Sequence, residues 1–575
     1  MMKLFGLLRP YRLSVLTVLV LIFIQSLSTL YLPNLMADIV NTGIVKGDTP
    51  YIVRVGGFML AISIVGVVAS VGASFFASKV SSGFGLTLRA KLFTHVENFT
   101  LHEFDDFGTS SLITRTTNDI TQVQQLVNMM LRMMVMAPMT AIGGVIMAVS
   151  TDAKLSLVIV VVMPILGLTI YFVLRRGIAL FQAMQIKIDK LNRVLRENLT
   201  GIRVIRSFNR IEYEQHRFDA ANLDLTDTAT RVNKIMATLM PVMMLIINFA
   251  TIAILWFGSI RVNSGAMQVG NLMAFLQYVM QILFSVMMVS MMFFMIPRAS
   301  ASAARINEVL ERVPEMKDPT EAVDAPTRKG YVEFRDVTFS YPGAEQPVLS
   351  AISFLAQPGE VTAIIGGTGS GKTTLVSLIP RFYDLDDGQV LVDGVDVRDM
   401  SQESLRQRIG FVPQKAVLFS GTVTENVRFG KEDASEEDVM QAIDVAQARE
   451  FVEAMKGGFE AVIAQGGMNL SGGQKQRLSI ARALVRRPEV YIFDDSFSAL
   501  DFKTDANLRS ALRPEIADST VFIVAQRVST VMDADRIIVL DEGRIAGIGN
   551  HEELMETCLV YREIVSSQLS EEEIA

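Results

Sequence analysis

The sequence predicts a helical membrane domain of six spanning helices, followed in the same chain by an α/β domain. Three observations lead to this prediction. The first 300 residues hold six long apolar stretches, the residues from about 330 onward alternate short β-rich runs with helical runs, and a proline-containing segment separates the two regions. Half of the 575 residues are hydrophobic and the mean hydropathy is +0.36, which is more apolar than soluble domains usually are.

Six stretches are long enough to cross a bilayer as helices. At about 1.5 Å rise per residue, roughly 20 residues cross the hydrocarbon core. A buried helix of a soluble domain would explain one such stretch, but six in succession favour a membrane domain. We expect spans two to five to continue beyond the membrane as long cytoplasmic helices. The six stretches cover residues 14–32, 55–77, 133–151, 155–174, 235–260 and 271–297.

Lysine and arginine in the loops indicate the orientation, because cytoplasmic loops of membrane proteins are enriched in them. The segment after the fourth stretch holds nine such residues between Arg175 and Arg210. The loops expected on the other side are short and poor in positive charge, with Lys46, Lys154 and Arg261. We therefore expect a multi-pass protein of the cell (inner or plasma) membrane whose two termini and α/β domain are cytoplasmic.

The second half of the chain has the pattern of an α/β domain with a mainly parallel sheet. The intervening segment, residues 314–329, holds three prolines. The expected domains are therefore a membrane domain over 1–313, a linker over 314–329 and an α/β domain over 330–575. The β-rich runs cover residues 331–334, 361–365, 389–392, 490–493, 520–524 and 536–540.

Charge and cysteine content narrow the function classes. The net charge is -7, which is not the basic footprint of a nucleic-acid-binding protein, so no nucleic-acid partner is expected. Cys558 is the single cysteine, so no disulfide can form within the chain and no cysteine cluster can bind zinc. With only four histidines, a histidine metal site is not expected either.

A glycine-rich string follows the run at 361–365 and precedes a helix expected to begin near Thr373. Residues 366–373 fit the P-loop pattern, in which backbone N–H groups wrap phosphates and the helix N-terminus adds a positive dipole. Lys372 is expected to reach the β- and γ-phosphates of ATP, and Thr373 to hold Mg²⁺. The expected ATP-binding residues are Gly366, Gly367, Thr368, Gly369, Ser370, Gly371, Lys372, Thr373 and Thr374.

Two further strings suit the same chemistry. Asp494 ends an apolar run and is the expected second Mg²⁺ residue, although a buried structural aspartate is the alternative. Residues 470–474 read Leu-Ser-Gly-Gly-Gln, and paired glycines before a helix make another anion site. Because the chain already has a P-loop, this second site makes sense if it closes over ATP held by another subunit.

Together these motifs resemble those of ATP-binding cassette (ABC) exporter half-transporters, in which six spans are fused to one nucleotide-binding domain. The resemblance covers nearly the whole chain and rests on the P-loop, on Val412-Pro-Gln414, on the signature string 470–474, on the strand ending at Asp494 and on Ser498-Ala-Leu-Asp501. It implies that two nucleotide domains meet head to tail. Each of two ATP molecules then lies between one domain's P-loop and the other domain's signature.

The resemblance also implies roles for individual residues. Tyr341 is expected to stack on adenine, Gln414 to contact Mg²⁺ and sense the membrane domain, and Asp501 to couple the two sites across the interface. Residues 107–115 and 201–208 resemble the stretches that flank the coupling helices of the family. The residues expected to contact the partner's ATP are Ser471, Gly472, Gly473 and Gln474.

Two positions depart from the family pattern at the point of hydrolysis. The family has Glu after the strand aspartate, where it positions the attacking water; Asp495 keeps the charge but is one methylene shorter. The switch His of the family is Gln526 here, which cannot take up a proton. Gln465 also stands where exporters usually have Glu before the signature.

These departures predict that the chain's own P-loop site binds ATP and cleaves it poorly, since a general base is typically worth ~10²–10⁴-fold. The partner would then be a second, non-identical half-transporter whose catalytic site this chain's signature completes. A slow homodimer, in which both substitutions are tolerated, is the alternative.

The transported compound is indicated only by class. We expect a small hydrophobic or amphipathic compound, such as a drug, lipid or peptide, to be exported across the bilayer by alternating access. A methionine-rich face of the sixth span, with Met280, Met287 and Met291, is the candidate path because Met adapts to varied apolar surfaces; helix packing would explain it as well. A nucleotide-gated regulatory subunit and a peptide exporter are the other classes considered.

Cysteine labelling tests the expected topology. In a background without Cys558, a reagent that cannot cross the membrane is expected to label cysteines placed at 46 and 154 from outside. A cysteine at position 190 is expected to react only after the membrane is opened. Protection of positions 46 and 154 from the external reagent would contradict the orientation.

Overall fold

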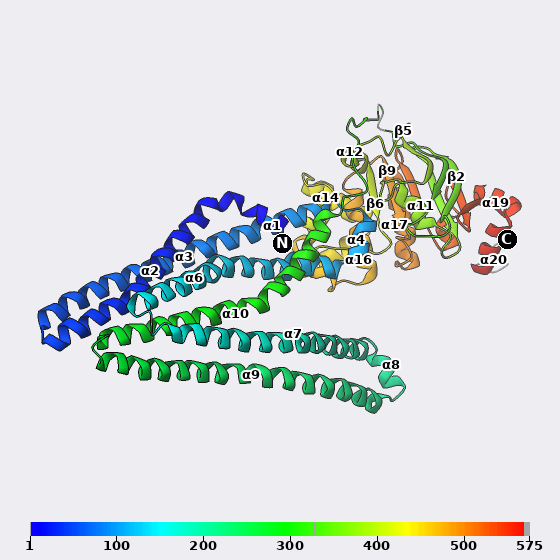
Figure 1. The fold of residues 1–575 in the computed structure, drawn as a ribbon. Helices are drawn as coiled ribbons and strands as arrows, with labels where there is room; N and C mark the ends of the chain where they lie inside the picture. The colour runs from blue at the N-terminus through cyan, green and yellow to red at the C-terminus, as the bar shows by residue number, and fades with distance from the viewer. Residues whose placement is uncertain (1, 326–328, 569–575) are drawn as a thin grey trace. The chain divides into compact units, whose positions relative to one another are not determined.

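The computed structural model describes residues 2–325 and 329–568 (Figure 1). Residues 326–328 of the expected linker, and the side chain of Met291, lie outside the described residues. The chain divides into two compact units. The first comprises Met1–Glu97 and Ser110–Arg312, and the second comprises Asn98–Thr109 and Val313–Ala575.

The first unit is helical, and the prediction of six spans is confirmed. Among the described residues, six helical segments are long and apolar enough to cross a membrane. Several helices carry an internal proline, which membrane helices tolerate because neighbouring groups satisfy the freed carbonyl. The long helices are α2 (Arg12–Asp38), α3 (Thr49–Glu97), α6 (Ile120–Thr151), α7 (Leu157–Thr200), α9 (Ile211–Asn263) and α10 (Val269–Glu311).

Short elements join these helices. The lengths of α3, α7 and α9, at 49, 44 and 53 residues, agree with the expected extensions beyond a bilayer, which needs only ~20 residues. The connecting elements are α1 (Met2–Phe5), η1 (Gly6–Tyr11), η2 (Ile39–Ile44), α5 (Thr109–Thr114), η3 (Arg115–Asp119) and α8 (Ile202–Ser207).

Helix packing in this unit is close where small residues meet backbone. A Cβ on Gly270 would lie 2.4 Å from the carbonyl oxygen of Ala37, so only glycine fits at the start of α10. Asn41 reinforces this approach, because its Oδ1 accepts from the Gly270 N–H at 2.8 Å and its Nδ2 donates to Asn271 at 3.0 Å. The helices α7 and α9 run side by side and are joined at one end by α8 (Figure 1).

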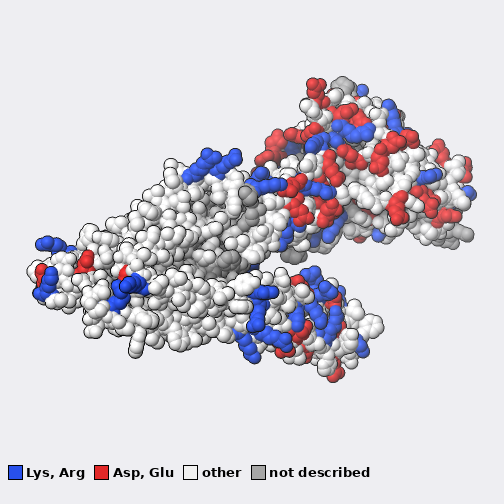
Figure 2. All heavy atoms as spheres, in the orientation of Figure 1, with Lys and Arg blue, Asp and Glu red and all other residues white. Residues whose placement is uncertain are grey.

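Charge is distributed as the spans require. On the face shown in Figure 2, the middle of the helical unit bears almost no charged residue, while lysine and arginine gather around the ends of α7 and α9 near α8. The second unit is densely covered with both signs of charge. An uncharged band of this kind is what a helix surface facing lipid needs.

The second unit contains two main sheets and a two-stranded one. One has the order β2-β1-β4-β5 and is antiparallel; the other has the order β12-β11-β3-β10-β9-β6 and is parallel except for β12. The strands are β1 (Val332–Phe339), β2 (Leu349–Ala356), β3 (Val361–Gly366), β4 (Asp387–Val392), β5 (Val395–Asp396), β6 (Ile409–Val412), β7 (Gly421–Thr422), β8 (Val462–Ile463), β9 (Val490–Asp494), β10 (Thr520–Val524), β11 (Arg536–Asp541) and β12 (Arg544–Gly549).

All six predicted β-rich runs are strands, but two of them are not in the parallel sheet. The runs at 331–334 and 389–392 belong to β1 and β4, which pair antiparallel with each other. In β1, buried residues largely alternate with more exposed ones, which is typical of an antiparallel sheet with one face on the core. The expectation of one mainly parallel sheet was therefore incomplete.

The central strands of the parallel sheet are covered on both faces, so every residue of β9 and β10 is buried. Residues of one face, such as Ile365 and Phe493, pack with the helices that follow in the chain. Residues of the other face, such as Ile364 and Ile492, pack with α11 and the antiparallel sheet. The helices are α11 (Lys372–Leu378), α12 (Gln402–Gln407), α13 (Val423–Arg428), α14 (Glu436–Val445), α15 (Arg449–Ala454), α16 (Gly472–Leu484), α17 (Phe502–Glu515), α18 (Val528–Val531), α19 (His551–Thr557) and α20 (Leu559–Gln568).

A buried ion pair anchors the start of this unit. Asp393 and Arg408 have side chains 0% and 3% exposed, and their Oδ2 and Nη1 atoms are 3.1 Å apart. The other oxygen of Asp393 accepts from the backbone N–H groups of Gly330 and Tyr331 at 2.9 and 3.1 Å. The pair therefore fixes the point where the linker enters β1.

Replacing Asp393 with Ala is expected to destabilise the nucleotide domain by about 3–5 kcal/mol, because it leaves the Arg408 charge buried without its carboxylate. Urea unfolding of the purified chain measures this loss. Glu333→Ala is the matched control, since it removes a surface partner of Arg335 and is expected to change stability little. Equal losses of stability from the two substitutions would show that burial of the Asp393–Arg408 pair does not determine its contribution to stability.

Candidate nucleotide-binding site

The parallel sheet brings the predicted nucleotide residues to one edge. The P-loop follows β3, Asp494 ends β9, and Gln526 lies two residues after β10. These three strands are neighbours and run parallel, so their carboxyl ends meet at one edge, where open α/β sheets bind ligands. The site residues that are far apart in sequence are therefore close in space.

The P-loop has the shape of a phosphate cradle. Gly371 has a φ of +96°, a left-handed conformation that favours glycine, and α11 begins at Lys372. The Lys372 ammonium folds over the loop and donates to the carbonyl oxygens of Gly366 and Gly367 at 3.0 and 2.6 Å. Burial lowers the pKa of Lys372, although Asp495 and Asp494 act to raise it.

Thr373 and Asp494 provide oxygen donors beside the P-loop. The Thr373 Oγ1 hydroxyl donates to Asp494 Oδ1 at 3.0 Å. Burial raises the pKa of Asp494 and the neighbouring Asp495 raises it further, whereas Thr373 and Lys372 act to lower it. A hydroxyl and a carboxylate that is costly to ionise fit a hard divalent cation such as Mg²⁺, which takes oxygen ligands. Among the described residues, no group of three or more His, Cys, Asp or Glu side chains suits a metal.

The two departures from the family pattern lie in direct contact. The amide Nε2 of Gln526 donates to Asp495 Oδ2 at 2.8 Å, and Nε2 of Gln414 donates to the same oxygen at 3.2 Å. Asp495 is only 9% exposed and has a φ of +46°. One carboxylate oxygen thus receives two amide donors, and neither donor can accept a proton from water.

The signature forms an exposed helix start. Ser471 caps α16: its Oγ accepts from the Gln474 N–H at 3.3 Å, and its own N–H donates to Gln474 Oε1 at 2.9 Å. Ser471 and Gly472 are exposed, so the helix N-terminus faces outward from this unit. Asp501 caps α17 in the same way by accepting from the Thr504 N–H at 3.0 Å, and these bonds lower its pKa.

Tyr341 lies between the P-loop helix and a small cavity. Its hydroxyl is 3.0 Å from Thr374 Oγ1, and its ring packs edge-on against Phe339 and Tyr383. The cavity has a volume of about 340 Å³ and is also lined by Thr100 and His102. Thr100 caps the N-terminus of α4 (Leu101–Phe107), and His102 lies in its first turn. The α4 segment is held by Glu103, whose carboxylate accepts from the N–H groups of Thr100 and Glu315 at 2.9 and 3.0 Å.

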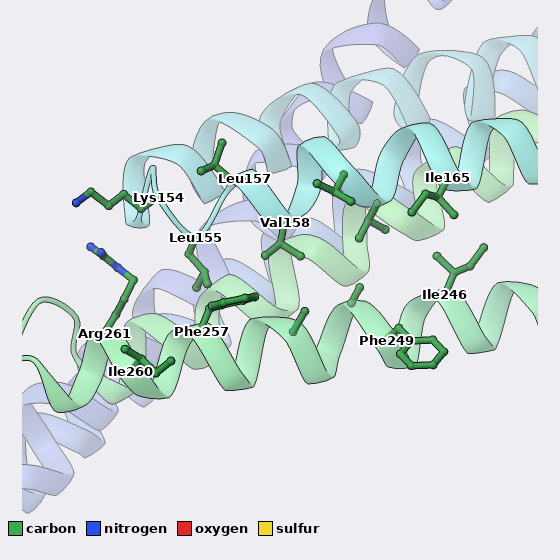
Figure 3. A pocket seen from close by; sticks show the side chains of 14 residues that line it. Lys154, Leu155, Leu157, Val158, Ile165, Ile246, Phe249, Phe257, Ile260 and Arg261 are labelled. Atoms are coloured by element: carbon green, nitrogen blue, oxygen red, sulfur yellow. The ribbon is translucent and has the colours of Figure 1, made fainter.

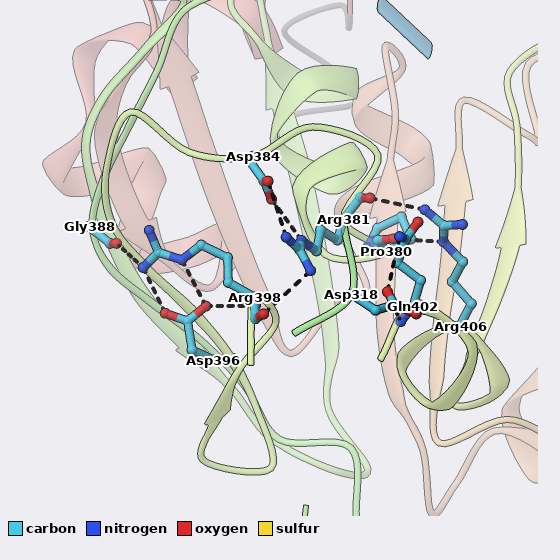
Figure 4. Close-up of polar contacts among 9 residues, drawn as sticks. All are labelled: Asp318, Pro380, Arg381, Asp384, Gly388, Asp396, Arg398, Gln402 and Arg406. Atoms are coloured by element: carbon cyan, nitrogen blue, oxygen red, sulfur yellow. Dashed lines mark hydrogen bonds and ion pairs between the residues drawn. The ribbon is translucent and has the colours of Figure 1, made fainter. Parts of the chain in front are cut away.

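The wall of this cavity was not anticipated from the sequence. Arg381, which follows α11, donates to Asp384 at 2.7 Å, and Arg406 donates to the carbonyl oxygens of Pro380 and Arg381 (Figure 4). Arg398 donates hydrogen bonds to the Asp396 carboxylate and to the Gly388 carbonyl oxygen. These bonds fix the turn that carries Phe382 and Tyr383. The many arginines and aspartates among residues 381–399 are the sequence signal from which this wall could have been predicted.

Comparison with known proteins agrees with this architecture. Residues 15–286 match the family described as the ABC transporter transmembrane region, and residues 349–498 match the ABC transporter domain. An uncharacterized ABC transporter ATP-binding protein of Mycobacterium tuberculosis is 45% identical over 97% of each chain. An ATP-dependent lipid A-core flippase of Chromobacterium violaceum is 32% identical over 94% of this chain and 92% of the flippase. A bacterial Atm1-family ABC exporter solved with ATP bound superposes with a TM-score of 0.81 at 24% identity, over 97% of this chain and 99% of that chain.

The chain therefore belongs to the ABC transporter family. It is an exporter half-transporter, a multi-pass membrane protein in which six spans are fused to one ATP-binding domain. The predicted fold class is confirmed, and the transporter is driven by ATP.

Replacing Asp494 with Asn is expected to stabilise the nucleotide-free protein at neutral pH. Because the folded pKa of this carboxyl is raised, the folded state holds the proton more tightly than the unfolded chain, and stability falls as pH rises through the raised pKa. Asparagine has no titratable carboxyl group, so the variant does not lose this stability as the pH rises. Thermal unfolding at about pH 5 and pH 7 measures it; a variant that loses stability at both pH values would contradict the argument.

Proposed function

We propose that this chain is one subunit of a heterodimeric ABC exporter, and that the ATP site on its own P-loop retains ATP with little turnover. The observation that carries the proposal is the Asp495 carboxylate, whose Oδ2 receives both the Gln526 and the Gln414 amides. A carboxylate occupied in this way is not directed at a water molecule. The switch position offers an amide, which cannot carry a proton or a positive charge.

The expected size of the defect follows from general catalysis. A positioned general base typically contributes ~10²–10⁴-fold. A displacement of about 1 Å in a reacting group costs ~10²-fold, and Asp places its carboxylate one methylene farther back than Glu. Both effects act on hydrolysis more than on ATP binding, because the P-loop and Lys372 are intact.

The productive site would be completed by this chain's signature. The exposed N-terminus of α16 offers backbone N–H groups and the Ser471 hydroxyl, together with Gly472, Gly473 and Gln474. Donors of this kind stabilise charge that develops on a γ-phosphate in the transition state. Asp501, at the start of α17, would couple the two sites.

ATP would bind with Tyr341 beside its adenine and the loop from Gly366 to Thr374 around its phosphates. Thr373, Asp494 and Gln414 would hold Mg²⁺, which neutralises charge between the β- and γ-phosphates when bound. The protein's own part is to position these oxygens. The two termini and the nucleotide domain are proposed to be cytoplasmic in the cell membrane.

The substrate is proposed to be hydrophobic or amphipathic. A cavity of about 370 Å³ lies among α2, α6 and α10, and its lining combines Met287 and Met136 with the uncharged polar groups of Gln25, Ser26 and Gln281. Met280 does not line this cavity. A relative that is a lipid A-core flippase favours a lipid among the substrate classes. A slow homodimer with two such sites, in which both substitutions are tolerated, is the second candidate.

Hydrolysis by a co-purified pair tests the asymmetry. In the pair, Asp495→Asn is expected to cost little steady-state turnover, because this site contributes little. Ser471→Arg is expected to lower turnover by ~10²-fold or more, because it removes transition-state donors from the working site. Lys372→Ala is expected to weaken ATP binding at one of two sites.

Two outcomes would contradict the heterodimer proposal. If Asp495→Asn alone removes nearly all turnover, or if this chain purified alone hydrolyses ATP briskly and transports, the heterodimer proposal fails. The homodimer would then replace it.

A further inference from the structure

A long apolar groove runs between α7 and α9 in the membrane unit. Its volume is about 750 Å³, within the ~300–1,000 Å³ range of ligand pockets. Twelve of its lining residues are apolar, and the two charged ones, Lys154 and Arg261, lie together at one end (Figure 3). The groove thus has an apolar length and a single cationic mouth.

The groove on α9 is somewhat longer than one leaflet of the hydrocarbon core is thick. On α7 it extends to Ile165 and on α9 it runs from Ile246 to Ile260. At 1.5 Å per residue, the stretch on α9 is about 20 Å long, whereas half of a bilayer's hydrocarbon core is about 15 Å. Leu155, Val162 and Ala250 form its buried floor, whereas side chains at its rim are exposed in this chain, with Leu157 at 64% and Phe249 at 63%.

The charges at the mouth are not balanced. Arg261 donates through Nε to Asp152, which is buried, at 2.5 Å. Lys154 is exposed, and its side chain makes no hydrogen bond or ion pair among the described residues. In Figure 3 the Lys154 and Arg261 side chains approach each other from opposite sides of the mouth. Two cations and one carboxylate leave one net positive charge there.

We propose that this groove is a binding site for an anionic phospholipid. One acyl chain lies along the apolar walls of α7 and α9, and the phosphate headgroup is held at the mouth by Lys154 and the free side of the Arg261 guanidinium. Because the mouth carries net positive charge, an anionic lipid is favoured over a zwitterionic one. One such cation near an anionic lipid surface is worth about fivefold in binding.

The chain carries its own probe for this site. Trp256 is the single tryptophan and is 69% exposed. It is not one of the residues that line the groove, but it precedes the lining residue Phe257 and lies on α9 seven residues after Phe249 and four before Ile260, so its ring stands beside the groove on the same face of the helix. Lipids with brominated acyl chains quench tryptophan fluorescence on close contact.

The experiment compares brominated phosphatidylglycerol with brominated phosphatidylcholine on the reconstituted full-length protein, after any tryptophan of a partner subunit has been replaced by Phe. The wild-type site is expected to prefer phosphatidylglycerol about fivefold. Lys154→Gln is expected to bring this preference close to one. Lys46→Gln removes an exposed lysine from another loop and is expected to leave the preference unchanged. Arg261 is not varied, because its loss would leave the buried Asp152 carboxylate without this cation.

A second variant tests the groove rather than the charge. Ala253→Phe fills the middle of the groove and is expected to reduce quenching by both lipids while Lys154 stays in place. Equal quenching of the wild type by both lipids would overturn the proposal, since the contact would then be a non-selective lipid shell. Absence of quenching by either lipid would overturn it too, because a partner subunit's helices would then cover the groove.

Discussion

The nucleotide site depends on the parallel pairing of β3, β10 and β9. This pairing places the P-loop, Asp494 and the residues after β10 at one edge, although Gly366 and Gln526 are 160 residues apart in the chain. A one-residue slip in the register would turn every strand side chain to the opposite face. Because both faces of this sheet are closely packed, a shifted register would require two cores to repack, and the native register fixes the distances among Thr373, Asp494, Asp495 and Gln526.

The same edge explains why Asp495 is placed as it is. Its backbone N–H donates to the Val524 carbonyl at 2.9 Å, so the residue is tied to β10 while it turns out of β9 with a positive φ. Aspartate tolerates this left-handed conformation better than most side chains. The short carboxylate then receives the Gln526 and Gln414 amides. Backbone geometry and side-chain length act together on the chemistry proposed for this site.

Much of this could be predicted from the sequence, because the signals were local. The six spans followed from apolar length, and the P-loop from its glycines and the strand before it. The antiparallel pairing of β1 with β4 was missed, because short β-rich runs do not reveal their partners. The Asp393–Arg408 pair was also missed, since a buried ion pair joins residues whose proximity depends on the finished fold. The contact between Asp495 and Gln526 could not be predicted either: the two departures were recognised separately, and only the sheet brings them within 2.8 Å.

The segment Asn98–Thr109 belongs to the same compact unit as residues 313–575, although two hundred residues of membrane helix separate them. The Glu103 carboxylate closes this unit by accepting from the backbone of Glu315, and α4 lines the cavity beside Tyr341. During synthesis α4 must therefore wait while four membrane spans are inserted, and it meets its binding surface only when the residues that follow position 313 have left the ribosome. The contact between α4 and the nucleotide domain is therefore formed late in biogenesis. The helix α4 is synthesised early, and the nucleotide domain packs against it only after its own synthesis. A fragment that begins at residue 330 would lack this helix, and the wall at Phe382 and Tyr383 would lose the cover that Thr100 and His102 give it.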